Sequence, residues 1–458
     1  MNIVSKIPFL NSLKELWANP TIRKRVLYTL GAIFLYRFMA AIPPAGIDQE
    51  AFIEVFRGNP LTNIFTLATG GSLDTPSIVM IGLGAYINAS IIIQLLSTVI
   101  PKLEELKDEG QHGRRILNQY TRYLTIPLSI LQAIVIYVLL SRSSALVGTD
   151  INLDVVTFIA SIAAGSLVLM WIGELITENG VGNGTSIIIT FSVISSLPRL
   201  IRTDVGDVIP VFNSFLDGAI SFTQMISSPS VLFFVSMIVG LMLLVVVIVH
   251  MNEAVRKIAI QYARRTTGAQ NNYLPIRLNQ AGVMPIIFAS AILTFPSIVS
   301  QLLVSVVDQG SRAFEMLTAI NESFVGNFNS IGYNIFYFVL IIGFTFFYNF
   351  VVQKPSDTSD NLKKSGAFIP GIRPGNATDK YLKGVLLRLT TVGALFLAVI
   401  AIIPTIVRAT HTSLVANTQL GILSGIGGTS LLIVVSVFLT TYRQIQSMKV
   451  TKSYDRYR

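Results

Sequence analysis

Cysteine is absent from this chain of 458 residues, which excludes disulfide bonds and zinc or redox chemistry based on cysteine. Charged residues are also scarce: they make up 13% of the sequence, whereas soluble domains carry roughly 25%. Hydrophobic residues make up 52%, and the mean hydropathy is +0.64. This balance argues against a string of soluble domains and predicts one polytopic membrane domain.

Signatures of enzymes are missing as well. The sequence has no Walker phosphate loop, no cluster of metal ligands and no nucleophile beside a base, and its three histidines are scattered. Ionisable residues are nearly absent from the middle of the apolar stretches, with Arg37 the clearest exception. We therefore expect no enzyme, no cofactor, no metal site and no relay of protons across the membrane.

The sequence does contain a series of apolar stretches, each close to the roughly 20 residues that cross a bilayer as a helix. We expect an all-α polytopic membrane protein with ten transmembrane helices at residues 24–42, 78–100, 120–140, 155–176, 183–201, 231–250, 281–302, 331–352, 385–407 and 428–443. Most of the 34 lysines and arginines fall in the two tails and in alternate loops. Because such loops stay in the cytoplasm, both termini are expected there.

Five of the expected spans lie on each side of the polar segment 202–230. An odd number of spans in each half gives the halves opposite topologies. We therefore expect two pseudo-symmetric inverted halves, residues 1–201 and 231–443, followed by a cytoplasmic tail, 444–458. The segment 202–230 would be an external hinge or loop. The symmetry is inferred from counting spans, because no strong repeat of individual residues is visible.

A half-length apolar piece precedes the second span. Residues 61–76 read LTNIFTLATGGSLDTP, with Gly70-Gly71 near their end and Pro76 as the last residue. Pieces too short to cross the bilayer are tolerated only where protein or water covers their free backbone groups. The pattern predicts a re-entrant helix inside the membrane, a feature that a plain helix bundle lacks.

Two of the cytoplasmic loops, residues 251–280 and 353–384, are long and basic. At about 30 residues each, they exceed the few residues that usually connect helices. Their surplus of lysine and arginine favours docking to RNA or to an acidic protein surface, which salt would weaken. In the second loop, DNLKKS (360–365) predicts a short capped helical turn, and FIPGIRPG (368–375) predicts a tight turn that holds Arg373 outward.

Several bulky aliphatic residues near the middle of the expected spans lie beside stretches that weaken a helix. They are Leu83, Ile87, Ile189, Val283, Ile287 and Ile433. Ordinary packing in the core or against lipid accounts for any one of them. As a set, they would instead form a hydrophobic constriction that excludes ions by dewetting. A secondary transporter and a lipid flippase are the alternatives, and they would require intramembrane carboxylates or a polar groove.

Six segments, in order along nearly the whole chain, resemble the SecY family, the protein-conducting channels of the bacterial Sec translocon. They are GAYINASIIIQLL (84–96), GRRILNQYTRY (113–123), GELITENGVGNGTSIII (173–189), PIRLNQAGVMPIIFAS (275–290), DNLKKSGAFIPGIRPG (360–375) and GGTSLLIVV (427–435). The resemblance implies a channel that translocates unfolded polypeptides across the cytoplasmic membrane. It also implies that apolar segments of the passing chain are released laterally into lipid.

The same resemblance implies roles for individual residues. The pore ring would consist of Leu83, Ile87, Ile189, Val283, Ile287 and Ile433, and the plug, residues 61–75, would include Asn63, Ile64, Phe65, Leu67, Gly70 and Gly71. Asn88 and Ser186 would belong to the lateral gate, which spans two, three, seven and eight would form. The docking residues would be Arg256, Lys257, Arg264, Arg265, Lys363, Lys364 and Arg373.

Partners and location follow from the resemblance too. The implied partners are SecE-like and SecG-like small membrane subunits, the SecA ATPase, the ribosome, nascent polypeptides with their signal sequences, and membrane lipid. The implied location is the bacterial cytoplasmic (inner) membrane.

Overall fold

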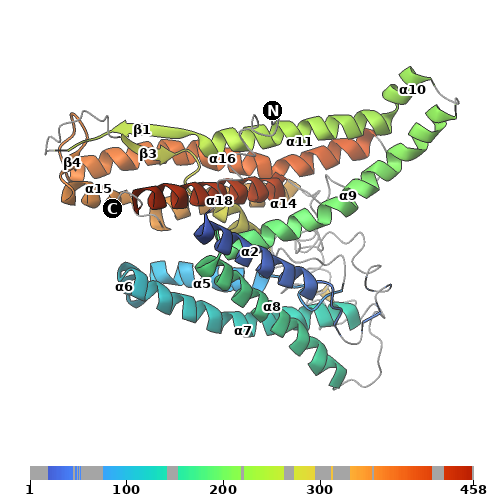
Figure 1. The fold of residues 1–458 in the computed structure, drawn as a ribbon, viewed down its shortest axis with the longest axis horizontal. Helices are drawn as coiled ribbons and strands as arrows, with labels where there is room; N and C mark the ends of the chain where they lie inside the picture. Colours follow the sequence, from blue (N-terminus) through green and yellow to red (C-terminus); the bar gives the residue numbers. More distant parts are fainter. Residues whose placement is uncertain are drawn as a thin grey trace. The chain divides into compact units, whose positions relative to one another are not determined.

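A computed structural model describes residues 19–44, 47–48, 50, 52, 76–141, 153–217, 221–262, 273–293, 311–312, 331–352, 355–414 and 428–455. Long helices make up most of these residues, together with two small two-stranded sheets (Figure 1). The chain divides into two compact units. One comprises Met1–Leu197, Ile298–Phe314 and Ile433–Arg458, and the other comprises Pro198–Ser297 and Glu315–Leu432.

The described part of the first unit consists mainly of helices. They are α2 (Pro20–Met39), α5 (Gly84–Val99), α6 (Pro101–Asp108), α7 (Gln111–Ser141), α8 (Leu153–Asn179), residues 184–197 of α9 (Gly184–Leu216) and residues 433–455 of α18 (Gly428–Asp455). Helix α7 packs against both α5 and α8, and α2 packs against α8. The core cluster contains Phe52, Met80, Ile81, Ala133, Ile136, Leu140, Phe158 and Ile162.

The second unit combines helices with the two sheets. Its elements are the rest of α9, α10 (Phe222–Ser227), α11 (Pro229–Glu253), β1 (Val255–Ala259), β2 (Gln261–Tyr262), β3 (Tyr273–Arg277), α14 (Ile331–Phe347), the π-helical turn η3 (Tyr348–Val352), α15 (Pro355–Lys364), β4 (Ala367–Phe368) and α16 (Asn376–Leu414). Strands β1 and β3 form an antiparallel hairpin, and β2 pairs antiparallel with β4. Helix α14 packs against α16.

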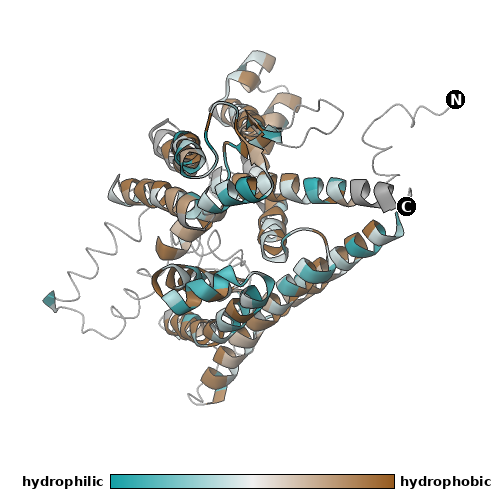
Figure 2. Ribbon diagram, turned by 90° about the vertical axis from the view of Figure 1, so that its left-hand side faces the viewer, coloured by the Kyte–Doolittle hydropathy of each residue, from teal (hydrophilic) through white to brown (hydrophobic). Residues whose placement is uncertain are grey.

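Six described helices are long and apolar enough to cross a membrane, and a seventh is possible if the bent pair α5 and α6 counts as one span. Each of the ten predicted spans overlaps a described helix, including the short apolar helix Met284–Leu293 for the seventh span. Figure 2 shows hydrophobic residues along most of the length of the long helices. The prediction of an all-α polytopic membrane protein is confirmed.

The second predicted span, 78–100, begins later than expected. Residues 78–83 form turns, and α5 starts only at Gly84. The reason is Gly82, whose φ of 61° is left-handed and cannot continue a right-handed helix. The carbonyl oxygen of Gly82 accepts a hydrogen bond from the hydroxyl of Ser166 at 3.1 Å, so α8 satisfies a backbone group that the break leaves free.

The segment 202–230, expected to be an external hinge or loop, is largely helical. Helix α9 continues through Pro198 and Pro210 to Leu216, and α10 follows. Helix α9 has 33 residues. At 1.5 Å per residue it is about 50 Å long, which exceeds the ~30 Å thickness of a bilayer's hydrocarbon core. The rings of Phe215 and Phe222 lie 6.1 Å apart and join the end of α9 to α10. The predicted plug, residues 61–75, lies outside the described residues.

A substitution at Gly165 can test how closely α8 packs against the turn that precedes α5. A Cβ atom at this position would overlap the carbonyl oxygen of Ile78. We expect Gly165→Ala to destabilise the protein by about 1–3 kcal/mol, because the backbone must move apart, although alanine favours a helix over glycine. The measurement is thermal unfolding of the purified protein in detergent.

The matched control is Gly31→Ala in α2. A Cβ atom there would meet no atom within 4 Å, so only helix propensity acts, and its melting temperature should equal or exceed that of the unchanged protein. A Gly165→Ala protein that melts no lower than the Gly31→Ala protein would contradict the packing described here.

Candidate functional site

The six predicted pore-ring residues are all buried. Leu83, Ile87, Ile189 and Ile433 belong to the first unit, and Val283 and Ile287 belong to the second. Burial agrees with both ordinary packing and a closed constriction. That the six side chains meet in one ring stays a prediction.

Two pairs of these residues share one local backbone geometry. Leu83 follows Gly82, and Val283 follows Gly282, whose φ of 66° is also left-handed. In both cases the aliphatic residue stands just before a helix. Its carbonyl oxygen then accepts a hydrogen bond from the isoleucine four residues on: Ile87 N to Leu83 O is 2.9 Å, and Ile287 N to Val283 O is 3.2 Å.

This shared geometry is a residue-level repeat that the sequence analysis missed. Each unit contains a left-handed glycine, an aliphatic residue at the helix start and an isoleucine one turn later. In the sequence, the pattern is a glycine, then an aliphatic residue, then three further residues and an isoleucine. It is too short to be distinguished from other apolar segments. In the described parts of the chain, it is the clearest sign that the two units use equivalent helix starts.

The predicted gate residues lie on two helices of the first unit. Asn88 is on α5 and half-buried, and Ser186 is buried in the first turn of α9. The side chain of Asn183 caps α9, accepting from the backbone N–H of Ser186 at 3.3 Å and from the hydroxyl of Thr185 at 2.6 Å. Ser186 is therefore held at a helix start, where its backbone conformation is fixed by a cap.

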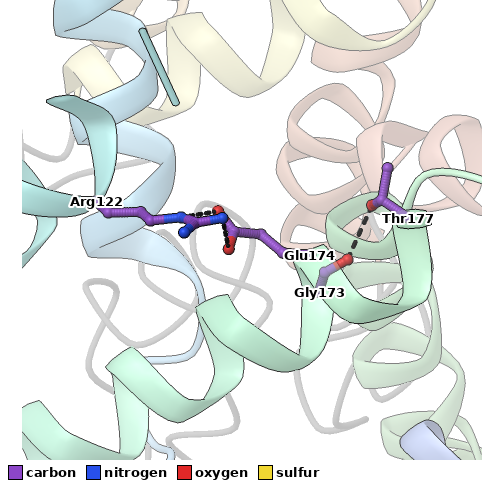
Figure 3. A network of polar contacts seen from close by, with 4 residues as sticks. All are labelled: Arg122, Gly173, Glu174 and Thr177. Atoms are coloured by element: carbon purple, nitrogen blue, oxygen red, sulfur yellow. Dashed lines mark hydrogen bonds and ion pairs between the residues drawn. The ribbon is translucent and has the colours of Figure 1, made fainter. Parts of the chain in front are cut away.

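A bidentate ion pair joins α7 to α8 (Figure 3). Arg122 Nε donates to Glu174 Oε1 at 2.9 Å, and Arg122 Nη2 lies 2.7 Å from Glu174 Oε2. One turn further along α8, the hydroxyl of Thr177 donates to the carbonyl oxygen of Gly173 at 2.8 Å. The Arg122 side chain is 46% exposed, so solvent screens the pair and its energetic contribution is modest. Its two parallel contacts define the relative orientation of the Arg122 and Glu174 side chains.

Arg37, the one clear ionisable residue inside a predicted span, has a polar partner. Its Nη1 donates to the hydroxyl of Ser195 on α9 at 2.8 Å. On the preceding residue, the hydroxyl of Tyr36 lies 2.8 Å from that of Ser192, and both are buried. Arg37 itself is exposed, and the two contacts together join α2 to α9.

The two basic loops fold together as one unit, the basic module, which consists of β1 to β3, α15, β4 and the start of α16. Gln261 pairs with Phe368 and Tyr262 with Ala367 across β2 and β4. Beneath these strands lies a shared apolar cluster of Ile258, Ile276, Leu362, Ala367, Ile369, Leu382, Val385 and Leu386. Each loop contributes to this core, so neither reaches its conformation independently.

Five predicted docking residues lie on the surface of this module. Arg256 and Lys257 are exposed on β1, Lys363 and Lys364 are exposed at the end of α15, and Arg373 is exposed in the following turn. Lys257 Nζ lies 4.9 Å from the centre of the Tyr273 ring, a cation–π contact. Arg264 and Arg265 lie outside the described residues.

The turn that carries Arg373 is held by its backbone. The carbonyl oxygen of Arg373 accepts from the hydroxyl of Thr378 at 3.0 Å, and Ile372 N donates to Ile369 O at 3.0 Å. Gly371 and Gly375 adopt φ values of 80° and 100°, which favour glycine. The predicted tight turn is present, and the predicted helical turn at 360–365 is the end of α15.

No group of three or more histidine, aspartate or glutamate side chains suited to hold a metal ion occurs among the residues that the structure describes. The chemistry of the candidate site is therefore that of apolar side chains, glycine turns and a basic surface.

Comparisons with known proteins agree with this picture. Residues 77–442 match the SecY family model. The protein translocase subunit SecY of Synechocystis sp. is 39% identical over 445 residues, which is 95% of this chain and 93% of the relative. The subunit of the same name from Pseudomonas aeruginosa is 38% identical over 454 residues, covering 97% and 93% of the two chains.

Solved structures share the fold. A structure of a protein-conducting channel superposes with a TM-score of 0.63 at 18% identity, covering 94% of this chain and 93% of the other. Sec61 in the canine ribosome–channel complex gives a TM-score of 0.61 at 18% identity, with the same coverage. The match of the family model and the identity to these relatives show that the chain is a member of the SecY family.

Proposed function

We propose that this chain forms a channel through which unfolded polypeptides cross the bacterial cytoplasmic membrane, with both of its own termini in the cytoplasm. As a SecY family member it is a protein-conducting channel and not an enzyme. The observation that carries the proposal is the pair of left-handed glycines, Gly82 and Gly282, each of which presents an aliphatic residue and an isoleucine at a helix start.

The physical problem that such a channel solves is the cost of charge in hydrocarbon. A Lys, Arg or Asp at mid-membrane costs roughly 2.5–3.5 kcal/mol on insertion scales. Water-filled funnels on the two sides of a narrow waist would remove most of this cost. Six aliphatic side chains at the waist offer no hydrogen bonds, so they would bind no particular sequence and would exclude ions by dewetting when the channel is empty.

Two further elements complete the proposed mechanism. Residues 61–75 would act as a plug on the external side. Spans two, three, seven and eight would form a lateral gate, with Asn88 on α5 and Ser186 at the start of α9. A sufficiently apolar segment of the passing chain would leave through this gate because lipid solvates it better than water does.

The basic module would face the cytoplasm and receive the partner that drives translocation, because a channel supplies no energy itself. Its five exposed basic residues suit an RNA or an acidic protein surface. Sec61 and the yeast Ssh1 complex, which share this fold, were solved bound to ribosomes. The ribosome and the SecA ATPase are the partners that we propose, with SecE-like and SecG-like subunits beside the channel in the membrane.

The proposed constriction makes a prediction about ion leak. We expect Ile287→Asn or Ile433→Asn to admit water to the waist and to add a measurable ion conductance, because a polar amide removes the dewetting barrier. The measurement is single-channel recording of the purified channel in planar bilayers. Ile433→Leu, which keeps the site apolar, should remain closed, and asparagine variants that add no conductance would refute the constriction.

The docking assignment predicts the effect of reversing one charge. We expect Arg373→Glu to reduce SecA-dependent secretion at least tenfold without lowering the melting temperature, because its side chain is exposed and only its backbone carbonyl is used by Thr378. The measurement is transport of a secreted precursor into membrane vesicles.

Lys380→Glu provides the matched control for Arg373→Glu. Lys380 is exposed on the same module, in the first turns of α16, and the substitution changes the charge by the same amount. It should leave most of the secretion intact. If the two variants secrete equally, net charge of the module matters and the specific role of Arg373 does not stand.

A further inference from the structure

The turn between α8 and α9, residues 179–184, is a point where three other parts of the first unit meet. Three of its backbone N–H groups donate to side-chain oxygens. Val181 N donates to Thr29 Oγ1 of α2 at 3.0 Å, Gly182 N to Gln444 Oε1 of α18 at 2.7 Å, and Gly184 N to Thr177 Oγ1 of α8 at 2.9 Å. Neither Thr29 nor Gln444 belongs to a recognisable motif of the sequence.

The backbone of the turn lies so close to α18 that Gly182 has no room for a side chain. A Cβ atom on Gly182 would lie 2.9 Å from Thr441 Oγ1 of α18 and 2.8 Å from Ile187 Cδ1. Gly182 also has a left-handed φ of 82°, which a side chain would strain. Helix α18 is therefore blocked from moving closer by Gly182 and held from moving away by its bond with Gln444.

Helix geometry connects this contact with the proposed pore ring. Gln444 lies eleven residues after Ile433 on α18. At about 100° per residue, eleven residues make three turns and roughly 20°, so the two side chains leave the same face of the helix. Val437, which is buried, and Thr441 lie between them on that face. The rotation that brings Gln444 to Gly182 therefore sets the direction of Ile433.

The other partner in this hydrogen bond, Gly182, lies next to the start of α9. Helix α9 begins at Gly184, two residues after Gly182, and carries the predicted gate residue Ser186 and the predicted ring residue Ile189. Thus one hydrogen bond joins the start of the helix with Ile189 to the helix with Ile433. Both ends lie in the first unit.

We propose that Gln444 is a positioning residue, whose bond to Gly182 fixes the rotation of α18 so that Ile433 faces Ile189 and the closed channel excludes polypeptides that lack a proper signal sequence. The second part of this proposal rests on the proposed channel function. The effect of a single hydrogen bond is limited, so its loss should shift the balance between closed and loosened channels by about two- to tenfold.

The absence of cysteine makes the rotation directly measurable, since introduced cysteines are the only thiols in the chain. Ile189→Cys is combined either with Ile433→Cys or with Val434→Cys, which points about 100° away. The full channel complex is treated in membrane vesicles with a short bifunctional thiol reagent. The ratio of the two crosslink yields, 433 over 434, reports the rotation of α18 without requiring transport.

Three substitutions in this background separate positioning from general packing. Gln444→Leu keeps the size of the side chain and removes the acceptor, so we expect the ratio to fall at least twofold. Gln444→Glu keeps an acceptor oxygen and should preserve the ratio. Gln446→Leu makes the same chemical change at an exposed position 200° around the helix and should have no effect.

The functional readout is export of a reporter enzyme with a defective signal sequence. In cells whose channel carries one of these substitutions without the introduced cysteines, export should rise about two- to tenfold with Gln444→Leu and stay at the basal level with Gln444→Glu or Gln446→Leu. If Gln444→Leu accumulates poorly, Gly182→Ala provides a second perturbation, because its Cβ displaces Thr441 and α18 with it.

The outcomes distinguish this proposal from the channel function. An unchanged crosslink ratio in Gln444→Leu, or in Gly182→Ala where Gln444→Leu accumulates poorly, overturns the positioning role, as does a native ratio that favours position 434. A lowered ratio with unchanged export supports the positioning of Ile433 and overturns its link to selectivity. Loss of the leak expected for Ile433→Asn would reject the constriction while leaving the rotation measurement valid.

Discussion

The structure depends on one constraint: inside a bilayer, every backbone N–H and C=O must find a partner within the protein. Helices meet this demand by themselves, but the points where they start do not. The break before α5 illustrates the solution. Gly82 ends the preceding turn, the hydroxyl of Ser166 on α8 donates a hydrogen bond to its carbonyl oxygen, and Leu83 then caps the start of α5. At the α8–α9 turn, three backbone N–H groups likewise find partners, in side-chain oxygens from three helices.

Helix starts in the membrane also decide which side chains are available for function. For a residue in the middle of a helix, the helical repeat fixes whether its side chain packs against protein or faces lipid. A residue at the start follows a glycine turn, and its direction is set by that turn. Leu83 and Val283 both occupy this position, each with an isoleucine one turn later. Glycine is required at both breaks because a left-handed φ strains any bulkier residue.

Much of the fold could be predicted from the sequence because hydropathy alone marks spanning helices. The start of α5 could not, since Val79, Met80 and Ile81 are as apolar as the helix itself and only the φ of Gly82 separates them. The helices within 202–230 were missed because charged residues such as Arg202 and Asp207 resemble a loop, although helices outside the bilayer tolerate them. Gln444 belongs to no motif, and only its distance to Gly182 reveals it.

The joining of the two basic loops could not be predicted either, for a different reason. Strands β2 and β4 contain two residues each, too few to show an alternating pattern, and their pairing spans about a hundred residues of sequence. The charges of Arg256 and Arg373 are visible in the sequence. They do not stabilise the fold of the loops, because solvent screens the interactions of exposed charges. Ile258, Ile276 and Leu362 do so by sharing one apolar cluster. A basic surface built on such a core therefore presents its charges at fixed positions.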